Sequence, residues 1–242
     1  MEANTNASIK SQADDDFLGN LLRGYRFSVC ETPAEAARAL DVRRAVYVDG
    51  SGYRIPVPDR YDARSWFLLA EDVETGRPVG SMRFTPRSAG PLECEEYFTL
   101  PKTLAVPGAV ELNRFAILPA YRKGKTFLPI VTLGLFKLVM QFLKRIDADW
   151  MVIASKPERV WTYEWIRFQR TGLTAAYAKL DYCEHELLSC HFRRIEEVLA
   201  GHPFYEFFVE ADCPEVVRPA TLPRLGLGID RVEEPLTLRA SA

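Results

Sequence analysis

A strand, a basic turn and a long helix follow one another between residues 109 and 145. Ala109 to Leu118 alternates in the manner of a strand, and Pro119 ends it because proline has no N–H to donate. A turn follows, and from about Leu128 to Arg145 apolar residues recur at helical spacing. A chain built this way must pack helices against a sheet, which indicates the α/β class.

The remaining segments predict a mixed order of strands and helices, with a mainly antiparallel sheet at its start. Thr32 and Glu35 suit a capping box, so a helix is expected from there to about Asp49. Glycine at residue 76 marks the turn of a hairpin. The other predicted elements are strands at Tyr25–Glu31, Trp66–Ala70, Val79–Phe84, Trp150–Ala154, Thr174–Leu180 and Glu186–Phe192, and helices from Pro157 to about Arg170, where Gly172 stops it, and at Ile195–Ala200.

Composition narrows the class of protein. Of the 242 residues, 48% are hydrophobic, which is enough for a sizeable core. The formal charge of −2 argues against a general nucleic-acid binder. We expect a disordered leader over residues 1–15, one domain over residues 16–212 and a Pro-rich tail over residues 213–242. Neither a transmembrane run nor a secretory signal is expected, and five cysteines suggest reduced thiols in a cytoplasmic protein.

The basic turn is a candidate anion site. Backbone N–H groups and the dipole of the following helix face the turn, and its cations add positive charge. The alternative is an ordinary exposed basic turn. The residues concerned are Arg122, Lys123, Gly124, Lys125 and Thr126, the last of which can cap the helix.

This strand, turn and helix together resemble the acyl-thioester binding motif of the GNAT acyltransferase superfamily. The resemblance implies that the turn, with Phe115, Ala116 and Ile117, binds the phosphates and pantetheine of the acyl donor. The second small residue of the superfamily pattern is missing after Gly124. That departure favours phosphopantetheine on a carrier protein over coenzyme A.

An ordered series upstream resembles the acyl-homoserine-lactone (autoinducer) synthases and the related N-acyl amino acid synthases. Tyrosines at both aromatic positions, and Asn113 where the former usually have serine, favour the N-acyl amino acid branch. The resemblance implies a GNAT-like mixed sheet flanked by helices. The matching positions are Arg43, Tyr47, Tyr53, Asp59, Asp62, Arg83, Glu111 and Arg114.

Aminolysis of a thioester needs a proton acceptor and stabilisation of an oxyanion. Glu111 can accept the proton, with Arg114 and Arg83 as catalytic partners, and an N–H near Phe115 or Ala116 can polarise the carbonyl. Alternation predicts Leu112, Arg114 and Ala116 on one face of the strand, and Glu111, Asn113, Phe115 and Ile117 on the other.

Each assignment has a structural alternative. Glu111 can simply pair with Arg114 or Arg83, and the Asp59–Asp62 segment can be a solvated turn. Tyr47 and Tyr53 can be core residues instead of lining the donor path. By resemblance, Arg43, Asp59 and Asp62 organise the N-terminal segments over the donor and the amine. The acyl slot would draw on residues 127–142 and 150–153 with Trp161, Trp165 and Phe168, which also suit an ordinary core.

The sequence therefore predicts an N-acyltransferase that moves a fatty acyl group from acyl-carrier protein to an amino acid or a derivative of one. The co-substrate is an acyl-phosphopantetheine thioester, no cofactor is tightly bound, and Arg122, Lys123 and Lys125 would dock the acidic carrier. No metal site is expected, because the spacing of Cys183, His185, Cys190 and His191 fits no tetrahedral pattern. The alternatives are a coenzyme A-dependent acetyltransferase and a non-catalytic acyl-binding module.

Overall fold

One eight-stranded sheet runs through the protein, in the strand order β6-β7-β5-β4-β3-β2-β1-β8. The computed structural model describes residues 20–123 and 128–229, so the predicted leader, residues 1–15, lies outside the described residues. Neighbouring strands are antiparallel except at β4–β5 and β1–β8, which confirms the mixed, mainly antiparallel sheet. The strands are β1 Tyr25–Val29, β2 Trp66–Asp72, β3 Pro78–Pro86, β4 Ala109–Ile117, β5 Trp150–Ser155, β6 Gln169–Tyr177, β7 Cys183–His191 and β8 Val216–Val217.

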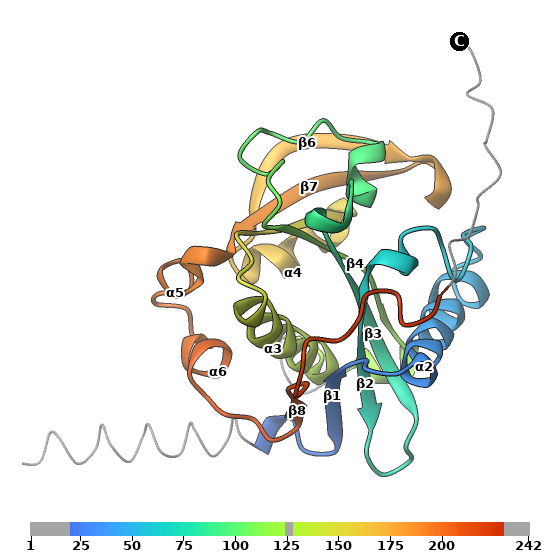
Figure 1. Cartoon of the computed structure of the whole chain (residues 1–242), viewed down its shortest axis with the longest axis vertical. Helices are drawn as coiled ribbons and strands as arrows, with labels where there is room; N and C mark the ends of the chain where they lie inside the picture. Colours follow the sequence, from blue (N-terminus) through green and yellow to red (C-terminus); the bar gives the residue numbers. More distant parts are fainter. Residues whose placement is uncertain (1–19, 124–127, 230–242) are drawn as a thin grey trace, which may run out of the picture.

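Helices cover the two faces of this sheet (Figure 1). Helix α2 (Pro33–Arg43) continues as a π-helix over Arg44–Asp49 and packs on one face, against Phe67 and Leu69 of β2. Helix α3 (Ile130–Arg145) packs on the other face, and α4 (Val160–Trp165) joins the same core. Two short helices, α5 (Ile195–Val198) and α6 (Tyr205–Val209), follow β7.

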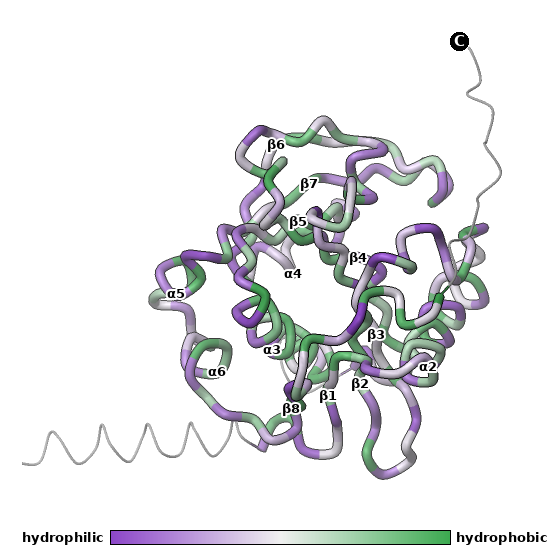
Figure 2. The backbone as a smooth tube through the Cα atoms, in the orientation of Figure 1, coloured by the Kyte–Doolittle hydropathy of each residue, from purple (hydrophilic) through white to green (hydrophobic). Residues whose placement is uncertain are grey.

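Two sequence signals account for where these helices lie. The Thr32 side chain accepts the backbone N–H of Glu35, and the Glu35 carboxylate accepts the backbone N–H of Thr32, so the predicted capping box is confirmed. Nearly every residue of α3 is buried, and its tube is largely green in the hydropathy view (Figure 2). Within residues 20–123 and 128–229, no helix is both long and apolar enough to cross a membrane.

Glycine allows α3 to approach the sheet closely. A Cβ added at Gly134 would stand 2.1–2.4 Å from ring atoms of Phe27, a fully buried residue of β1. We expect Gly134→Ala to lower the free energy of unfolding by about 1–3 kcal/mol, even though alanine favours helix by about 1 kcal/mol. Urea unfolding measures this, with Lys144→Ala on the exposed last turn of α3 as the control. A more stable Gly134→Ala protein would contradict the close packing.

The structure differs from the sequence prediction mainly in the C-terminal part of the chain. The helix from Pro157 ends at Trp165 rather than Arg170, because the backbone of Arg167 adopts a left-handed φ of 72° and β6 then starts at Gln169. Gly172 therefore lies within a strand, beside a register shift between Arg170 and Thr174. Chain beyond Cys213, predicted to be irregular, adds the short parallel strand β8 to the sheet.

Candidate functional site

A β-bulge in β4 determines which side chains meet. Arg83 pairs with Asn113 and Ser81 with Ala116, so β4 has one extra residue at this point, where Arg114 adopts a φ of 53°. The bulge turns Arg114 onto the face that carries Glu111 and Asn113. Strict alternation had predicted Arg114 and Ala116 on the opposite face and Phe115 and Ile117 on this one, and that prediction was wrong. Past the bulge, Phe115 and Ile117 join the core that contains α3, whereas Ala116 packs on the α2 side.

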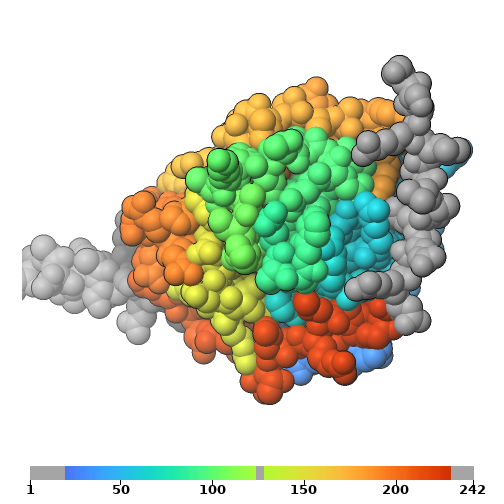
Figure 3. All heavy atoms as spheres, turned by 45° about the horizontal axis from the view of Figure 1, so that its top comes forward, coloured from blue at the N-terminus to red at the C-terminus, as the bar shows by residue number. Residues whose placement is uncertain are grey.

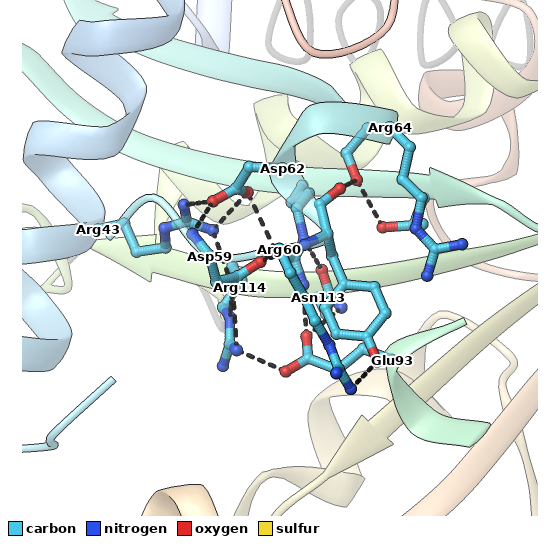
Figure 4. Close-up of polar contacts among 12 residues, drawn as sticks. Arg43, Asp59, Arg60, Asp62, Arg64, Glu93, Asn113 and Arg114 are labelled. Carbon is cyan, nitrogen blue, oxygen red and sulfur yellow. Dashed lines mark hydrogen bonds and ion pairs between the residues drawn. The ribbon is translucent and has the colours of Figure 1, made fainter. Parts of the chain in front are cut away.

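Three arginines and three carboxylates form a buried charged cluster on this face (Figure 4). Arg83 lies at its centre and donates to Asp59, Asp62, Glu93 and the Asn113 side chain. Arg43 reaches in from α2 and forms a two-pronged pair with Asp62. None of the charged side chains is more than 8% exposed. The charged cluster comprises Arg43, Asp59, Asp62, Arg83, Glu93 and Arg114.

The segment from Asp59 to Asp62 is a turn held by its own side-chain hydrogen bonds, and not a solvated one. Both carboxylates are buried, and they also fix their own loop: Asp62 Oδ2 accepts the Asp59 N–H at 2.6 Å, and Asp59 Oδ1 accepts the Tyr61 N–H at 2.9 Å. Burial by itself raises the pKa of Asp59. The guanidinium groups of Arg83, Arg114 and Arg43 outweigh it and hold that pKa well below its usual range.

Glu93 is the member of the charged cluster that the sequence prediction missed. It bridges Arg83 and Arg114 and accepts the Asn113 side-chain amide at 3.0 Å. Three buried arginines require three acids, and the motif series already supplied three, Asp59, Asp62 and Glu111. Charge balance therefore gave no signal for Glu93, which lies in the acidic run Glu-Cys-Glu-Glu at residues 93–96. In Figure 3 the connection that carries Glu93, drawn in green, covers the middle of this face.

Glu111 lies beside the charged cluster, with different partners from those expected. Its two oxygens accept the backbone N–H groups of Glu93, at 2.7 Å, and Cys94, at 3.1 Å. Within the described residues it forms no ion pair with Arg83 or Arg114, so the simple pairing alternative does not describe it. The three arginines of the charged cluster are already balanced by its three carboxylates. Glu111 is therefore a fourth buried acid, in excess of those arginines.

The ionisation of Glu111 follows from that position. Burial and then the negative charge of Glu93 raise its pKa to about 8, against the opposing attraction of Arg83 and the two backbone N–H groups. A carboxyl group that titrates near neutral pH is suited to accept and return a proton.

Of the two predicted tyrosines, Tyr47 contacts the bulge and Tyr53 lies beside Tyr47. The Tyr47 hydroxyl donates to the carbonyl oxygen of Phe115 at 3.1 Å and ties the π-helix to β4. The Tyr53 ring lies 6.3 Å from that of Tyr47, between ring centroids, and its hydroxyl receives a hydrogen bond from Lys156. Lys156 is a second residue that the sequence prediction missed.

Strands β4 and β5 separate directly beyond Glu111. Their parallel ladder runs from Ala109↔Trp150 to Glu111↔Val152 and ends there. The predicted donor residues Phe115, Ala116 and Ile117 therefore lie on the part of β4 that is past the ladder. Phe115 packs on Phe136 of α3, with 5.7 Å between ring centroids.

Only part of the basic turn lies within the described residues. Arg122 and Lys123 are exposed, and Arg122 Nε donates to the carbonyl oxygen of Ile117 at 2.8 Å, at the end of β4. Gly124, Lys125 and Thr126 lie outside the described residues. Helix α3 begins at Ile130 with Pro129 at its N-cap. In the described part of the chain, no three His, Cys, Asp or Glu side chains are grouped as metal ligands.

Comparison with known proteins identifies a matching family. The sequence profile described as N-acyl amino acid synthase FeeM matches residues 38–191, which include the whole charged cluster. Curated protein sequences give no significant match.

Three solved structures share the fold at low sequence identity. The structure of FeeM, an N-acyl amino acid synthase from uncultured soil microbes, is 16% identical with a TM-score of 0.61, covering 73% of this chain and 95% of FeeM. The CoA-dependent acyl-homoserine lactone synthase BjaI, with SAM and isopentyl-CoA, is 19% identical with a TM-score of 0.60, covering 84% and 97% of the two chains. The acyl-homoserine lactone synthase LasI is 18% identical with a TM-score of 0.55, covering 74% and 94%.

These similarities confirm the GNAT-like fold, and the profile match extends over well over half of the chain. The charged cluster, the bulge in β4 and the separation of β4 from β5 all lie within the matched residues. The chain is an acyltransferase and belongs to the N-acyl amino acid synthase FeeM family.

Proposed function

We propose that this acyltransferase moves a fatty acyl group from a carrier-protein thioester to the amine of an amino acid or a derivative of one. The observation that carries the proposal is Glu111: a buried carboxyl group with a pKa of about 8, placed where β4 parts from β5. The charged cluster fixes the bulge and holds Glu111 beside the segment that would receive the thioester.

Direct aminolysis fits the groups at this site. The amine nitrogen attacks the thioester carbonyl and its proton passes to the Glu111 carboxylate. The carbon–sulfur bond then breaks, and the leaving thiolate takes that proton back from Glu111 to give the free thiol. Because Glu111 is only 1% exposed, we propose that a water relays the proton. Backbone beside Phe115, which Tyr47 holds in place, would polarise the carbonyl. Arg83 and Arg114 act by positioning, since both are engaged by carboxylates.

The test uses purified protein, long-chain acyl-carrier protein and a panel of amino acids. Release of free thiol that depends on one of these amines, together with an N-acyl product identified by mass spectrometry, supports the proposal. Absence of thiol release with every amine and chain length would refute it. A non-catalytic acyl-binding module would bind the thioester without any release.

Coenzyme A is the alternative carrier of the acyl group. The synthase BjaI, 19% identical to this chain, is described as CoA-dependent. Comparing kcat/KM for acyl-coenzyme A and acyl-carrier protein of the same chain length separates the two donors. A higher value for acyl-coenzyme A would overturn the carrier-protein part of the proposal and leave the acyl transfer intact.

The exposed end of the basic turn supplies a docking prediction. Carrier proteins are acidic, so we expect Arg122→Glu with Lys123→Glu to raise KM for carrier-bound donor about tenfold, and to raise KM for a short pantetheine thioester much less. Arg193→Glu with Arg194→Glu is the control, because Arg193 pairs with Asp149 near the start of β5, at the opposite end of the β4–β5 pair. Equal increases for both donors would indicate phosphate contact rather than docking.

A further inference from the structure

A cavity lies between α3, α6 and the chain near Pro219, and it shares no residue with the charged cluster. Its volume is about 450 Å³, within the range of sites for small ligands. Its walls come from the C-terminal half of α3 and from α6, which pack together (Figure 1). The N-acyltransferase mechanism leaves this cavity without a role.

A buried cation lies in its wall. Lys137 is 1% exposed, and its ammonium group donates to the carbonyl oxygen of Phe207. Among the residues that the structure describes, no carboxylate pairs with it. Burial lowers the pKa of Lys137 to about 8, which still leaves it mostly charged at neutral pH.

The other charges around the cavity leave an excess of positive charge. Lys144 pairs with Glu196 at 2.8 Å, and Arg218 pairs with Asp212 at 3.4 Å. Arg145, like Lys137, is held by main-chain carbonyls, those of Pro219 and Ala220. Glu210 is the one carboxylate among the lining residues, so the local sum is one positive charge.

The half-buried side chain of Gln141 adds a donor that lacks a partner. The Gln141 side-chain oxygen accepts from Arg218 Nε at 3.2 Å, which leaves its nitrogen as the donor. That Nε2 atom is buried and has no hydrogen-bond partner within the described chain. A buried donor left unpaired has lost its water without gaining a partner, and a ligand oxygen would remove that cost.

The rest of the wall is apolar, with Leu138, Met140, Phe142, Phe208 and Val209. A single excess positive charge, an unpaired amide donor and an apolar wall together suit an anion with one charge and a hydrocarbon tail. We propose that this cavity binds a medium-chain carboxylate, with its head between Lys137, Gln141 and Arg218 and its chain along α3 and α6.

The test follows the methionine methyl groups by NMR while decanoate is added to the full-length protein labelled with [methyl-¹³C]methionine. Met140 lines the cavity, whereas Met82 and Met151 are buried in the sheet core, so the spectrum reports where the ligand binds. We expect the Met140 signal, assigned with Met140→Leu, to shift saturably. Lys137→Leu and Gln141→Leu should each raise the Kd at least tenfold, and decanol should bind more weakly by a similar factor.

Any of three results would overturn the proposal. One is a shift confined to Met82 or Met151, which would place decanoate elsewhere. The others are equal binding of decanol and decanoate, and an unchanged Kd in the variants. If Lys137→Leu fails to fold, Arg218→Ala decides, because this side chain is 63% exposed and its loss leaves the core intact. Binding is measured without a thioester, so the outcome is independent of the acyl-transfer proposal.

Discussion

Arg83→Met is expected to lower the free energy of unfolding by about 3–5 kcal/mol. Arg83 is 1% exposed and, among the residues that the structure describes, is the one cation that contacts Asp59, Asp62 and Glu93 together. Its removal leaves a buried site with excess negative charge. Urea unfolding monitored by circular dichroism at pH 7 measures the loss, and acyl transfer should disappear with it.

Arg170→Met is the matched control. Arg170 also contacts two carboxylates, Glu164 and Glu186, but it is 53% exposed and solvent screens both pairs. We expect this substitution to cost less than about 1 kcal/mol. Similar losses for the two variants would show that burial of the charged cluster does not determine its energetic importance.

Acidity should weaken the charged cluster in the wild-type protein. The pKa of Asp59 is depressed in the folded state, so its stabilisation is fully present above the unfolded value of about 4 and is lost as the pH falls below it. In Arg83→Met the Asp59 carboxylate has lost an attracting charge, so the same acid titration should lower stability less steeply. A steeper loss in the variant would contradict this assignment.

Glu111→Gln is expected to lower kcat by about 10²–10⁴-fold, the usual contribution of a positioned general base. Glutamine keeps the size of the side chain but cannot take a proton from the amine. It can also accept only one of the two backbone N–H groups of Glu93 and Cys94, so stability is measured alongside activity. Steady-state thiol release with saturating amine gives the rate.

The pH dependence identifies the role of Glu111. The carboxyl group works as a base when deprotonated, and its pKa is raised to about 8, so the wild-type rate should rise as the pH approaches 8 and level off above it. The acceptor amine titrates identically with both enzymes, so the ratio of wild-type to variant rates isolates the Glu111 titration. A ratio that is constant between pH 6 and 9 would exclude Glu111 as the base.

Glu95→Gln is the control for the loss of an acceptor. The Glu95 carboxylate also accepts a backbone N–H, that of Leu92 at 2.8 Å, in the same connection between β3 and β4. It pairs with Arg87 and lies outside the charged cluster. If Glu95→Gln reduced kcat as much as Glu111→Gln, the effect would come from a loosened connection rather than from proton transfer.

The periodic segments of the sequence predicted the fold well. The hairpin of β2 and β3, the strands β4 and β5 and the long helix α3 all lie within a few residues of their predicted limits. The sequence signals for these elements are local, because each is a regular spacing of apolar residues within one segment. That spacing gives the segment an apolar face that must be buried against a neighbouring element. Strand β6 was harder to predict because it is an edge strand with mostly exposed residues, so apolar alternation is weak there.

The sequence identified most residues of the site but not how their side chains are arranged. The motif series supplied Arg43, Asp59, Asp62, Arg83 and Arg114, all of which the structure brings together. It missed Glu93, since no local pattern distinguishes a buried acid from its neighbours in an acidic run. The bulge was missed as well, because a positive φ at Arg114 arises from the contacts of its side chain with Asp59 and Glu93, which are distant in sequence.

The charged cluster also constrains how the protein folds. Its members come from five segments: α2, the loop that precedes β2, strand β3, the connection from β3 to β4, and strand β4. No two neighbouring segments can neutralise all six charges by themselves. Their desolvation is offset only when every partner has arrived, so the cluster forms in one cooperative step that closes long chain loops. Contacts of this kind are made late, which means that catalytic competence should be regained only at the end of refolding, with no active intermediate before it.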